Sequence, residues 1–315
     1  MFNNVPPNLR DRPTLTIDLE SNRAGTIPVE LTYLTAGLSW NADYVAQLND
    51  KEDKLDLNGW VTLVNRSGTS YRDAKLQLVA GDPNRVRAGM ARERDEARPA
   101  PAPKSAMRTE AVFDYHLYEL ERPTTIAENQ QKQVALLSAS EVVVAKEYRL
   151  ESYGQYYRSR YTVPGTVKAD IWLHFANEKA SNLGLPLPRG VVRVYKRDST
   201  GKAVFVGEDQ INHTAEGERV RLKVGRAFDV SGLRAQTDFK SELSWQIYES
   251  AYKLELNNAK SEPVVVTIAE TIPGDWTVLN ESHRHTKVAS NLVEWKVPVP
   301  AKGKAELTYR VRVKF

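Results

Sequence analysis

The chain has no cysteine among its 315 residues, which excludes disulfide bonds, thiolate metal sites and cysteine nucleophiles. The compartment stays open, because proteins of oxidising compartments can also lack cysteine. No run of about 18 or more apolar residues occurs, so no membrane-spanning segment is expected. The sequence also lacks His-Glu-x-x-His, Gly-x-Ser-x-Gly, a phosphate-binding glycine loop and a dinucleotide fingerprint. Only enzymes whose catalytic residues are scattered along the chain remain open.

A bulk excess of positive charge is absent as well. The chain has 44 basic and 40 acidic residues, for a net charge of +4. Arg85–Arg108 alone holds seven basic and three acidic residues, which leaves 37 of each sign elsewhere. The folded body therefore has no charge excess with which to hold a polyanion such as nucleic acid. Nucleic acid is not an expected partner.

Alternating hydrophobicity is what the sequence does contain. Apolar residues occupy most alternate positions in Ile27–Tyr33, Leu55–Leu63, Val167–Phe175, Val220–Val230 and Leu307–Phe315. This period is typical of strands with one buried face, and no helix longer than about two turns fits the pattern. The polar, glycine-containing run from 197 to 202 predicts a hairpin loop between two such strands. We expect an all-β protein with two immunoglobulin-like or related antiparallel β-sandwich domains.

The chain is longer than one sandwich domain usually is, so two domains are expected. Residues 1–25 are treated as a lead-in segment. The first domain is placed at residues 26–160. It includes an Ala-, Arg- and Pro-rich insertion at about 82–109 that has too few large apolar side chains to offset the entropy of ordering and is expected to be a mobile loop. Pro164-Gly165 is a turn signal near the boundary, and residues 161–315 form the expected C-terminal sandwich.

Residues in and between these strands resemble a known family. They are Trp40, Tyr44, Trp60, Asn65, Ser67-Gly68, Tyr71, Leu76-Gln77-Leu78, Pro186–Tyr195 and Gly207-Glu208-Asp209. The set is similar to the core pattern of an uncharacterised bacterial family, the domain-of-unknown-function family 4139, and the resemblance covers nearly the whole chain. Members of that family include proteins labelled mucoidy inhibitors. The resemblance implies a periplasmic, secreted or otherwise extracellular protein with a link to surface polysaccharide, and it implies no particular reaction.

Members of this family usually begin with a signal sequence and a further N-terminal region. The first 13 residues here lack a basic patch followed by an apolar core, so they do not form a secretory signal. We expect Met1 to mark an artificial or truncated start that follows that region.

One cluster of aromatic and basic residues predicts a binding site. Tyr148–Gly165 contains five tyrosines and three arginines within eighteen residues. Flat aromatic faces with hydroxyl and guanidinium edges suit sugars and other envelope polymers. The binding candidates are Tyr153, Tyr156, Tyr157, Arg158, Arg160 and Trp172, the last on the polar side of its strand. Alternatively, the tyrosines fill a seam between the two domains.

No catalytic residue, metal ion or cofactor is assigned. His174, Asp209 and His213 are considered as metal ligands because Asp170–His174 and Asp209–His213 have the same spacing. Four strand residues span about 13 Å, so neither pair can share one ion unless the two strands are neighbours. Glu208 and Asp209 are adjacent and point to opposite faces of a strand, so they cannot act together on one bond.

The hypothesis is a non-catalytic cell-envelope protein, an interaction or glycan-binding module whose partner is surface polysaccharide or another envelope protein. Two alternatives remain. A hydrolase acting on envelope glycan or peptide would need Asp170, His174, Asp209 and His213 to converge. A structural assembly protein would join its partners through exposed β-edges.

Overall fold

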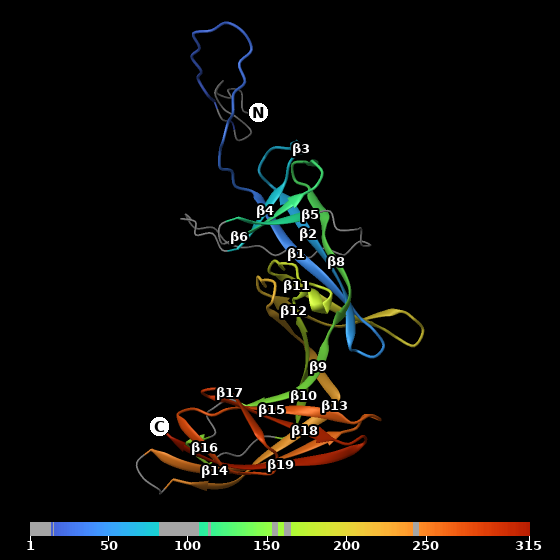
Figure 1. Ribbon diagram of the computed structural model, residues 1–315, viewed down its shortest axis with the longest axis vertical. Helices are drawn as coiled ribbons and strands as arrows, with labels where there is room; N and C mark the ends of the chain where they lie inside the picture. Colours follow the sequence, from blue (N-terminus) through green and yellow to red (C-terminus); the bar gives the residue numbers. More distant parts are fainter. Residues whose placement is uncertain are drawn as a thin grey trace, which may run out of the picture.

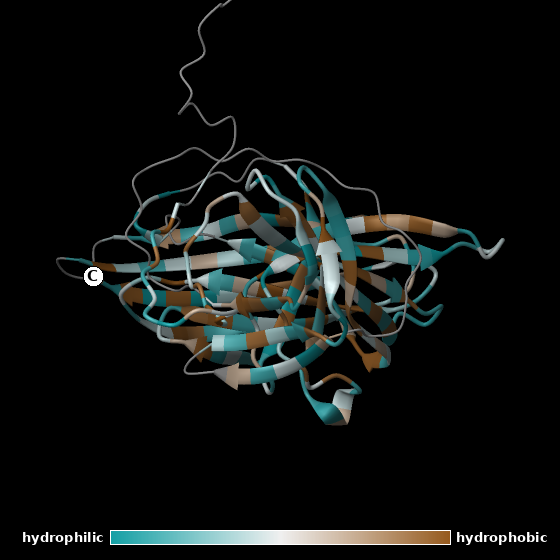
Figure 2. Ribbon diagram, turned by 90° about the horizontal axis from the view of Figure 1, so that it is seen from above, coloured by the Kyte–Doolittle hydropathy of each residue, from teal (hydrophilic) through white to brown (hydrophobic). Residues whose placement is uncertain are grey.

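The computed structural model describes residues 14, 16–81, 107–112, 115–152, 157–160, 165–241 and 246–315. These residues form nineteen strands and the short 3₁₀ helix Lys179–Ser181, and no α-helix occurs among them. The prediction of an all-β protein is confirmed. Polar and apolar residues alternate along the strands, as Figure 2 shows. This alternation gives each sheet one buried and one solvent-facing side.

A five-stranded sheet organises one half of the molecule (Figure 1). Its strand order is β12-β11-β1-β2-β8, and only β1 and β11 are parallel neighbours. The strands are β1 (Leu38–Leu48), β2 (Lys54–Asn65), β8 (Gln131–Val143), β11 (Gly190–Arg197) and β12 (Ala203–Ile211). The expected hairpin loop between β11 and β12 is confirmed.

Two small sheets lie beside it. One pairs β3 (Tyr71–Ala74) with β7 (Thr124–Ile126). The other has the order β4-β6-β5 and consists of β4 (Gln77–Ala80), β6 (Tyr115–Leu120) and β5 (Met107–Val112). Leu78 and Tyr118 of this sheet are buried in the same core as the five-stranded sheet.

A nine-stranded sheet forms the other half, in the order β16-β19-β14-β13-β10-β9-β15-β18-β17. Its strands are β9 (Ala145–Ser152), β10 (Val167–Ala176), β13 (Arg219–Lys240), β14 (Ile247–Asn258), β15 (Val264–Thr271), β16 (Asp275–Glu281), β17 (His285–Ala289), β18 (Leu292–Val299) and β19 (Gly303–Lys314). β9 and β15 run parallel, and every other pair is antiparallel. Figure 1 shows the sheet folded over, with β15 and β18 facing β14 and β19. A second core with Trp295 and Tyr309 fills the space between them.

Strands β10 and β13 belong to both cores. Leu173 of β10 and Leu222 of β13 are buried in the first core, whereas Ala169 and Val230 of the same two strands are buried in the second. The division of the chain at residue 160 stays a prediction, and pairing crosses it in both directions. β11 and β12 follow residue 160 and join the first sheet, and β9 precedes it and joins the second.

Two expectations about local structure were wrong. Ile27–Tyr33 alternates as a strand should, but it pairs with no strand among the described residues, and all of residues 16–36 are exposed. An extended segment needs a neighbour for its backbone groups, and alternation alone does not supply one. Met107–Thr109, expected at the end of the mobile insertion, belongs to β5 and pairs with β6. The rest of the insertion, 82–106, lies outside the described residues.

Candidate binding site

The tyrosine and arginine cluster does not form a surface site in its described part. Tyr153 and Tyr156 lie outside the described residues. Tyr157 is 1% exposed and lies in the second core. Arg158 is exposed, and its guanidinium lies 3.9 Å from the centre of the Phe315 ring. Arg160 is exposed as well.

Tyr157 belongs to a buried polar cluster around Glu270. The Glu270 carboxylate accepts hydrogen bonds from Tyr157 Oη at 3.2 Å, from Ser152 Oγ and from the guanidinium of Arg234. Burial, followed by the charge of Glu270, raises the pKa of Tyr157 well above its usual value. Glu270 is fully buried, so a ligand cannot reach its carboxylate. Arg234 forms an ion pair with it and balances its charge. The cluster therefore lies inside the second core and is not a surface site.

Trp172 is placed differently, on the outward face of β10. Leu173 and Phe175 point into the first core, so the alternation turns Trp172 and His174 toward solvent. Opposite them on β13, Lys223 pairs with Trp172 and Arg221 pairs with His174. We name the outward side chains of Trp172, His174, Arg219, Arg221 and Lys223 the Trp172 face.

Aromatic and cationic groups stack on this face. The guanidinium carbon of Arg221 lies 4.8 Å from the centre of the Trp172 ring, and Lys223 Nζ lies 5.9 Å from it. The rings of Trp172 and His174 are nearly parallel, with centres 6.4 Å apart. The attraction between a cation and an aromatic face holds Arg221 flat against the sheet.

The charges of the face are only partly neutralised. Lys223 Nζ lies 2.7 Å from the Asp170 carboxylate, and His174 Nε2 lies 2.6 Å from Glu147. Burial alone would raise the pKa of Glu147, but hydrogen bonds and charges from neighbours including His174 lower it to about 2. Arg219 and Arg221 have no carboxylate partner among the described residues. Two guanidinium groups are therefore available to an anion.

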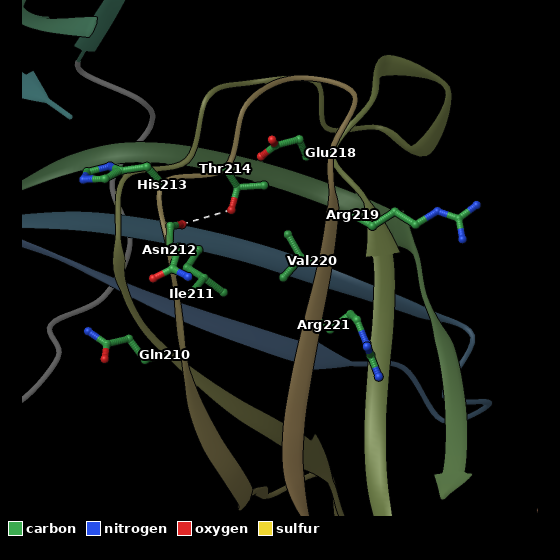
Figure 3. Close-up of a pocket in the computed structure, with 9 residues that line it drawn as sticks. All are labelled: Gln210, Ile211, Asn212, His213, Thr214, Glu218, Arg219, Val220 and Arg221. Atoms are coloured by element: carbon green, nitrogen blue, oxygen red, sulfur yellow. Dashed lines mark hydrogen bonds between the residues drawn. The ribbon is translucent and has the colours of Figure 1, made fainter. Parts of the chain in front are cut away.

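A cavity of about 540 Å³ adjoins this face, where the end of β12 and the start of β13 diverge below the turn 212–218. Figure 3 shows Arg219 and Arg221 leaving β13 on one side of the cavity, while Gln210 and His213 lie on the β12 side. The lining residues are Gln210, Ile211, Asn212, His213, Thr214, Glu218, Arg219, Val220 and Arg221. The cavity is polar and open to solvent, and a ligand lying on the face can extend a side group into it.

The turn that covers this cavity is fastened by Asn177, which is fully buried. Its Nδ2 donates to the carbonyl oxygens of Leu185 at 2.7 Å and Ala215 at 2.9 Å, and its Oδ1 accepts from the backbone N–H of Gly184 at 3.2 Å. One side chain thereby joins the loop after β10 to the turn before β13. The mouth of the cavity is held in place before a ligand binds.

The metal candidates are used in separate contacts. His174 pairs with Glu147, His213 Nδ1 accepts from the backbone N–H of Arg189 at 3.2 Å, and Asp209 Oδ2 accepts from the backbone N–H of Lys223 at 2.8 Å. The carboxylate of Asp170 forms an ion pair with Lys223 Nζ. Within the described residues, no three His, Asp or Glu side chains gather in a way that could hold a metal ion.

Sequence reasoning named Trp172 as a binding candidate and did not name Arg219 or Arg221. The signal was present in Arg219-Val220-Arg221-Leu222-Lys223, where basic residues occupy the positions between the apolar ones. Side chains two positions apart on a strand share a face and are about 7 Å apart. A row of cations on the outward face could therefore have been predicted together with the buried face of β13.

Comparison with known proteins identifies a matching family. Residues 29–315 match a family described as a domain of unknown function (DUF4139). No curated protein matches the chain. Within the described residues, no helix is long and apolar enough to cross a membrane.

Proposed function

This chain belongs to the DUF4139 family, and from that premise and the geometry of the Trp172 face we propose that it is a non-catalytic module that binds an acidic polysaccharide of the cell envelope. The proposal includes a periplasmic or extracellular location, where such polymers occur. The observation that carries it is that Arg219 and Arg221, on the same sheet face as Trp172, have no carboxylate partner among the described residues.

The spacing of the cations suits a ligand whose charge repeats. Arg219, Arg221 and Lys223 follow one another at every second position of β13, so their side chains are about 7 Å apart along the strand. A linear polymer of acidic sugars places carboxylates at similar intervals along a flexible chain. Guanidinium groups bind carboxylates through two parallel hydrogen bonds, and two such contacts in register favour a polymer over a single sugar.

The aromatic ring supplies the part of the recognition that is specific for sugars. Trp172 is half-buried and presents apolar area next to the polar edge of His174. The apolar face of a sugar ring would pack on the part of the Trp172 ring that Arg221 leaves uncovered, while its hydroxyls stay hydrated. The cavity beside Arg221, lined by Gln210, Asn212 and Thr214, offers hydrogen-bond donors and acceptors to a substituent of the polymer.

A binding role is favoured over hydrolysis by the contacts of the acidic and imidazole groups. Asp170 forms an ion pair with Lys223, and His174 contacts Glu147. Neither group is therefore free to act as a general acid or base. Hydrolysis of a glycosidic bond uses two carboxyl groups that flank the bond. The two carboxylates at the Trp172 face, Asp170 and Glu147, are each engaged by a basic side chain, which favours binding of a polymer over its hydrolysis.

Affinity electrophoresis in gels containing a polyuronate tests the proposal, with gels containing neutral dextran as the reference. We expect retardation in polyuronate alone, and weaker retardation as the salt concentration rises. Arg221→Ala and Trp172→Ala should each weaken binding about tenfold, because each removes a contact of about 1.4 kcal/mol. Arg284→Ala removes the same charge from an exposed position elsewhere and should bind normally. Equal retardation in dextran, or normal binding by Arg221→Ala, contradicts the proposal.

A further inference from the structure

One exposed segment of the chain has the pattern of a strand and pairs with no strand among the described residues. Its apolar residues at alternate positions are Ile27, Val29, Leu31 and Tyr33, and each has between 49% and 61% of its surface exposed. Figure 1 shows this part of the chain beyond β3, away from the sheets. Four exposed apolar side chains on one face of an extended chain suit addition to the edge of a sheet. We name Ile27–Tyr33 the donor segment.

The outer end of β12 is a sheet edge that can accept a strand. β12 is the outermost strand of its sheet and pairs with β11 alone among the described strands. From Gly207 onward it lies against β13, where Asp209 accepts from the backbone N–H of Lys223. Residues 203–206, which come before that contact, are all exposed. Every second residue of an edge strand directs its N–H and C=O away from the sheet. We name Ala203–Val206 the acceptor edge.

The acceptor edge lacks the charges that usually protect an edge strand from further pairing. β16 and β17, the outer strands of the nine-stranded sheet, carry such charges, at Asp275, Glu281 and Lys287. Ala203–Val206 contains apolar residues alone. Phe205 also packs edge-on against Tyr195 of β11, with ring centres 5.6 Å apart. The apolar row of a donor segment on this face would extend that aromatic pair.

The composition of the donor segment suits the position of an added outer strand. When its apolar residues direct their backbone groups toward β12, Pro28, Glu30 and Thr32 direct theirs to solvent. Proline has no N–H to lose there, and it hinders the addition of yet another strand. The charges agree as well. Residues 16–36 contain three acidic residues and one basic residue, whereas residues 195–206 contain three basic residues and one acidic residue. Opposite net charges favour the encounter of the two.

The donor segment cannot lie along the acceptor edge of its own chain. Through the register of β1, β11 and β12, Gly207 lies level with Ala46 of β1. β1 begins at Leu38, eight residues before Ala46, which corresponds to about 26 Å of strand. Tyr33 is five residues before Leu38, and five extended residues reach at most about 18 Å. A donor segment at this edge must therefore come from a second copy of the chain.

We propose that the donor segment of one chain pairs as an additional strand with the acceptor edge of a second copy. The interface joins two different surfaces, so each chain has one donor and one acceptor. Backbone hydrogen bonds along Ala203–Val206 supply the pairing. Burial of the apolar row beside Phe205 supplies most of the affinity.

Light scattering of the full chain across a range of concentrations tests the proposal. We expect the apparent mass to rise above the 35.5 kDa of one chain as the concentration increases. Leu31→Asp in the donor and Phe205→Asp at the acceptor should each raise the dissociation constant about tenfold or more, because each places a charge in the apolar contact. Leu19→Asp and Phe228→Asp change residues that are 70% and 87% exposed elsewhere, and both should associate normally.

Mixing the two interface variants gives the decisive result. Leu31→Asp keeps an intact acceptor and Phe205→Asp keeps an intact donor, so an equal mixture should associate although neither variant does so alone. Normal association by Leu31→Asp would indicate contact between two hairpins, and normal association by Phe205→Asp would indicate contact between two N-terminal segments. Either result overturns the proposal, as does a mixture that stays monomeric or a wild type that remains at the mass of one chain.

Hydrogen exchange locates the contact. The amides of Val29, Leu31 and Tyr33 should exchange quickly in dilute wild-type protein and several-fold more slowly at concentrations where the chain associates. The same amides in Leu31→Asp should exchange quickly at every concentration. Urea unfolding should show equal stability for Leu31→Asp and the wild type, since the position is exposed. Association without protection of these amides would assign the contact to another surface and overturn the proposal.

Discussion

Single side chains with several hydrogen bonds hold the loops of this protein. Asn65, Asn177 and Asn258 are each fully buried, and each donates from its amide to backbone carbonyls of a neighbouring loop. Asn65 is among the residues that carry the family resemblance, and so is Pro188, whose carbonyl accepts from Tyr44 Oη at 2.7 Å. These residues support the fold. The residues that carry the resemblance therefore include several that hold the architecture, whereas Arg219 and Arg221 lie outside them.

Residue type does not reveal which polar side chains are buried, because partners come from distant parts of the sequence. Tyr157 was a binding candidate, with burial between the domains as the alternative, and its buried hydroxyl donates to Glu270, which lies 113 positions later in the chain. The position of Trp172 on the polar side of its strand could be predicted, because the alternation of side chains along a strand depends only on neighbouring residues. The part of the site that alternation determines could be predicted, and the part that depends on strand pairing could not.

Glu52 gives a prediction for acid stability. It accepts from Lys146 at 2.5 Å and from Lys196 at 2.6 Å, and so ties the β1–β2 turn to β9 and β11. Burial opposes ionisation, but these hydrogen bonds and charges lower the pKa of Glu52 to about 2. Because the folded value lies below the unfolded value of about 4.5, the stabilisation is present above pH 4.5 and disappears as the pH falls toward 2.

We therefore expect Glu52→Gln to lower the free energy of unfolding by about 1 to 2 kcal/mol at pH 7, after allowance for partial solvation. The difference from the wild type should shrink between pH 4.5 and 2. Urea unfolding at pH 7, 4 and 2.5 measures it. Glu128→Gln, at an exposed position, should match the wild type throughout. A difference that stays constant with pH would show that the two lysines do not stabilise the Glu52 carboxylate.

At the scale of strands, the junction between β12 and β13 determines where the cavity lies. Gly207 has φ of +154°, and a Cβ atom on it would lie 1.9 Å from the carbonyl oxygen of Val224. Only glycine allows this approach. Asp209 adds a hydrogen bond to the backbone N–H of Lys223. The sequence Gly207-Glu208-Asp209 therefore positions β12 beside β13, and the two strands then diverge to leave the cavity open.

Most strands could be predicted, but apart from the β11–β12 hairpin their pairing could not. Alternation indicated the strands β2, β10, β13 and β19 because each buries one face. It also indicated Ile27–Tyr33, which has the same pattern but no sheet partner in the part of the chain that the structure describes. The parallel pair β1–β11 joins Ala42 to Gly190, and no local pattern of either strand specifies the other.

Gly207→Ala tests the junction. The methyl group must displace Val224 or bend β12, so we expect a loss of about 3 kcal/mol in the free energy of unfolding and weaker polyuronate binding. Gly201→Ala in the same hairpin has φ of +80° and no atom within 4 Å of the added carbon. It should cost only about 1 kcal/mol of backbone strain and leave binding unchanged. Equal losses for the two variants in urea unfolding would rule out a close contact at Gly207.

At the scale of the molecule, the shared strands decide how the two halves respond to stress. β13 is 22 residues long and contributes Val220 and Leu222 to one core and Ala227 and Val230 to the other. Melting either half leaves part of β13 without its buried face. The cost of that exposure couples the two halves, in contrast to sandwiches joined by a linker.

We therefore expect calorimetry of the full chain to show one unfolding transition. Leu57→Ala removes a buried side chain from the first core, and Leu307→Ala removes one from the second. Each should cost about 2 to 5 kcal/mol and lower the midpoint of the same transition by several degrees, whereas Leu19→Ala at an exposed site should not. Two sandwiches that fold independently on either side of residue 160 would instead give two transitions, each moved by one variant alone. That result would also mean that the Trp172 face, which is built on β10 and β13, can lose its support from one core while the other stays folded.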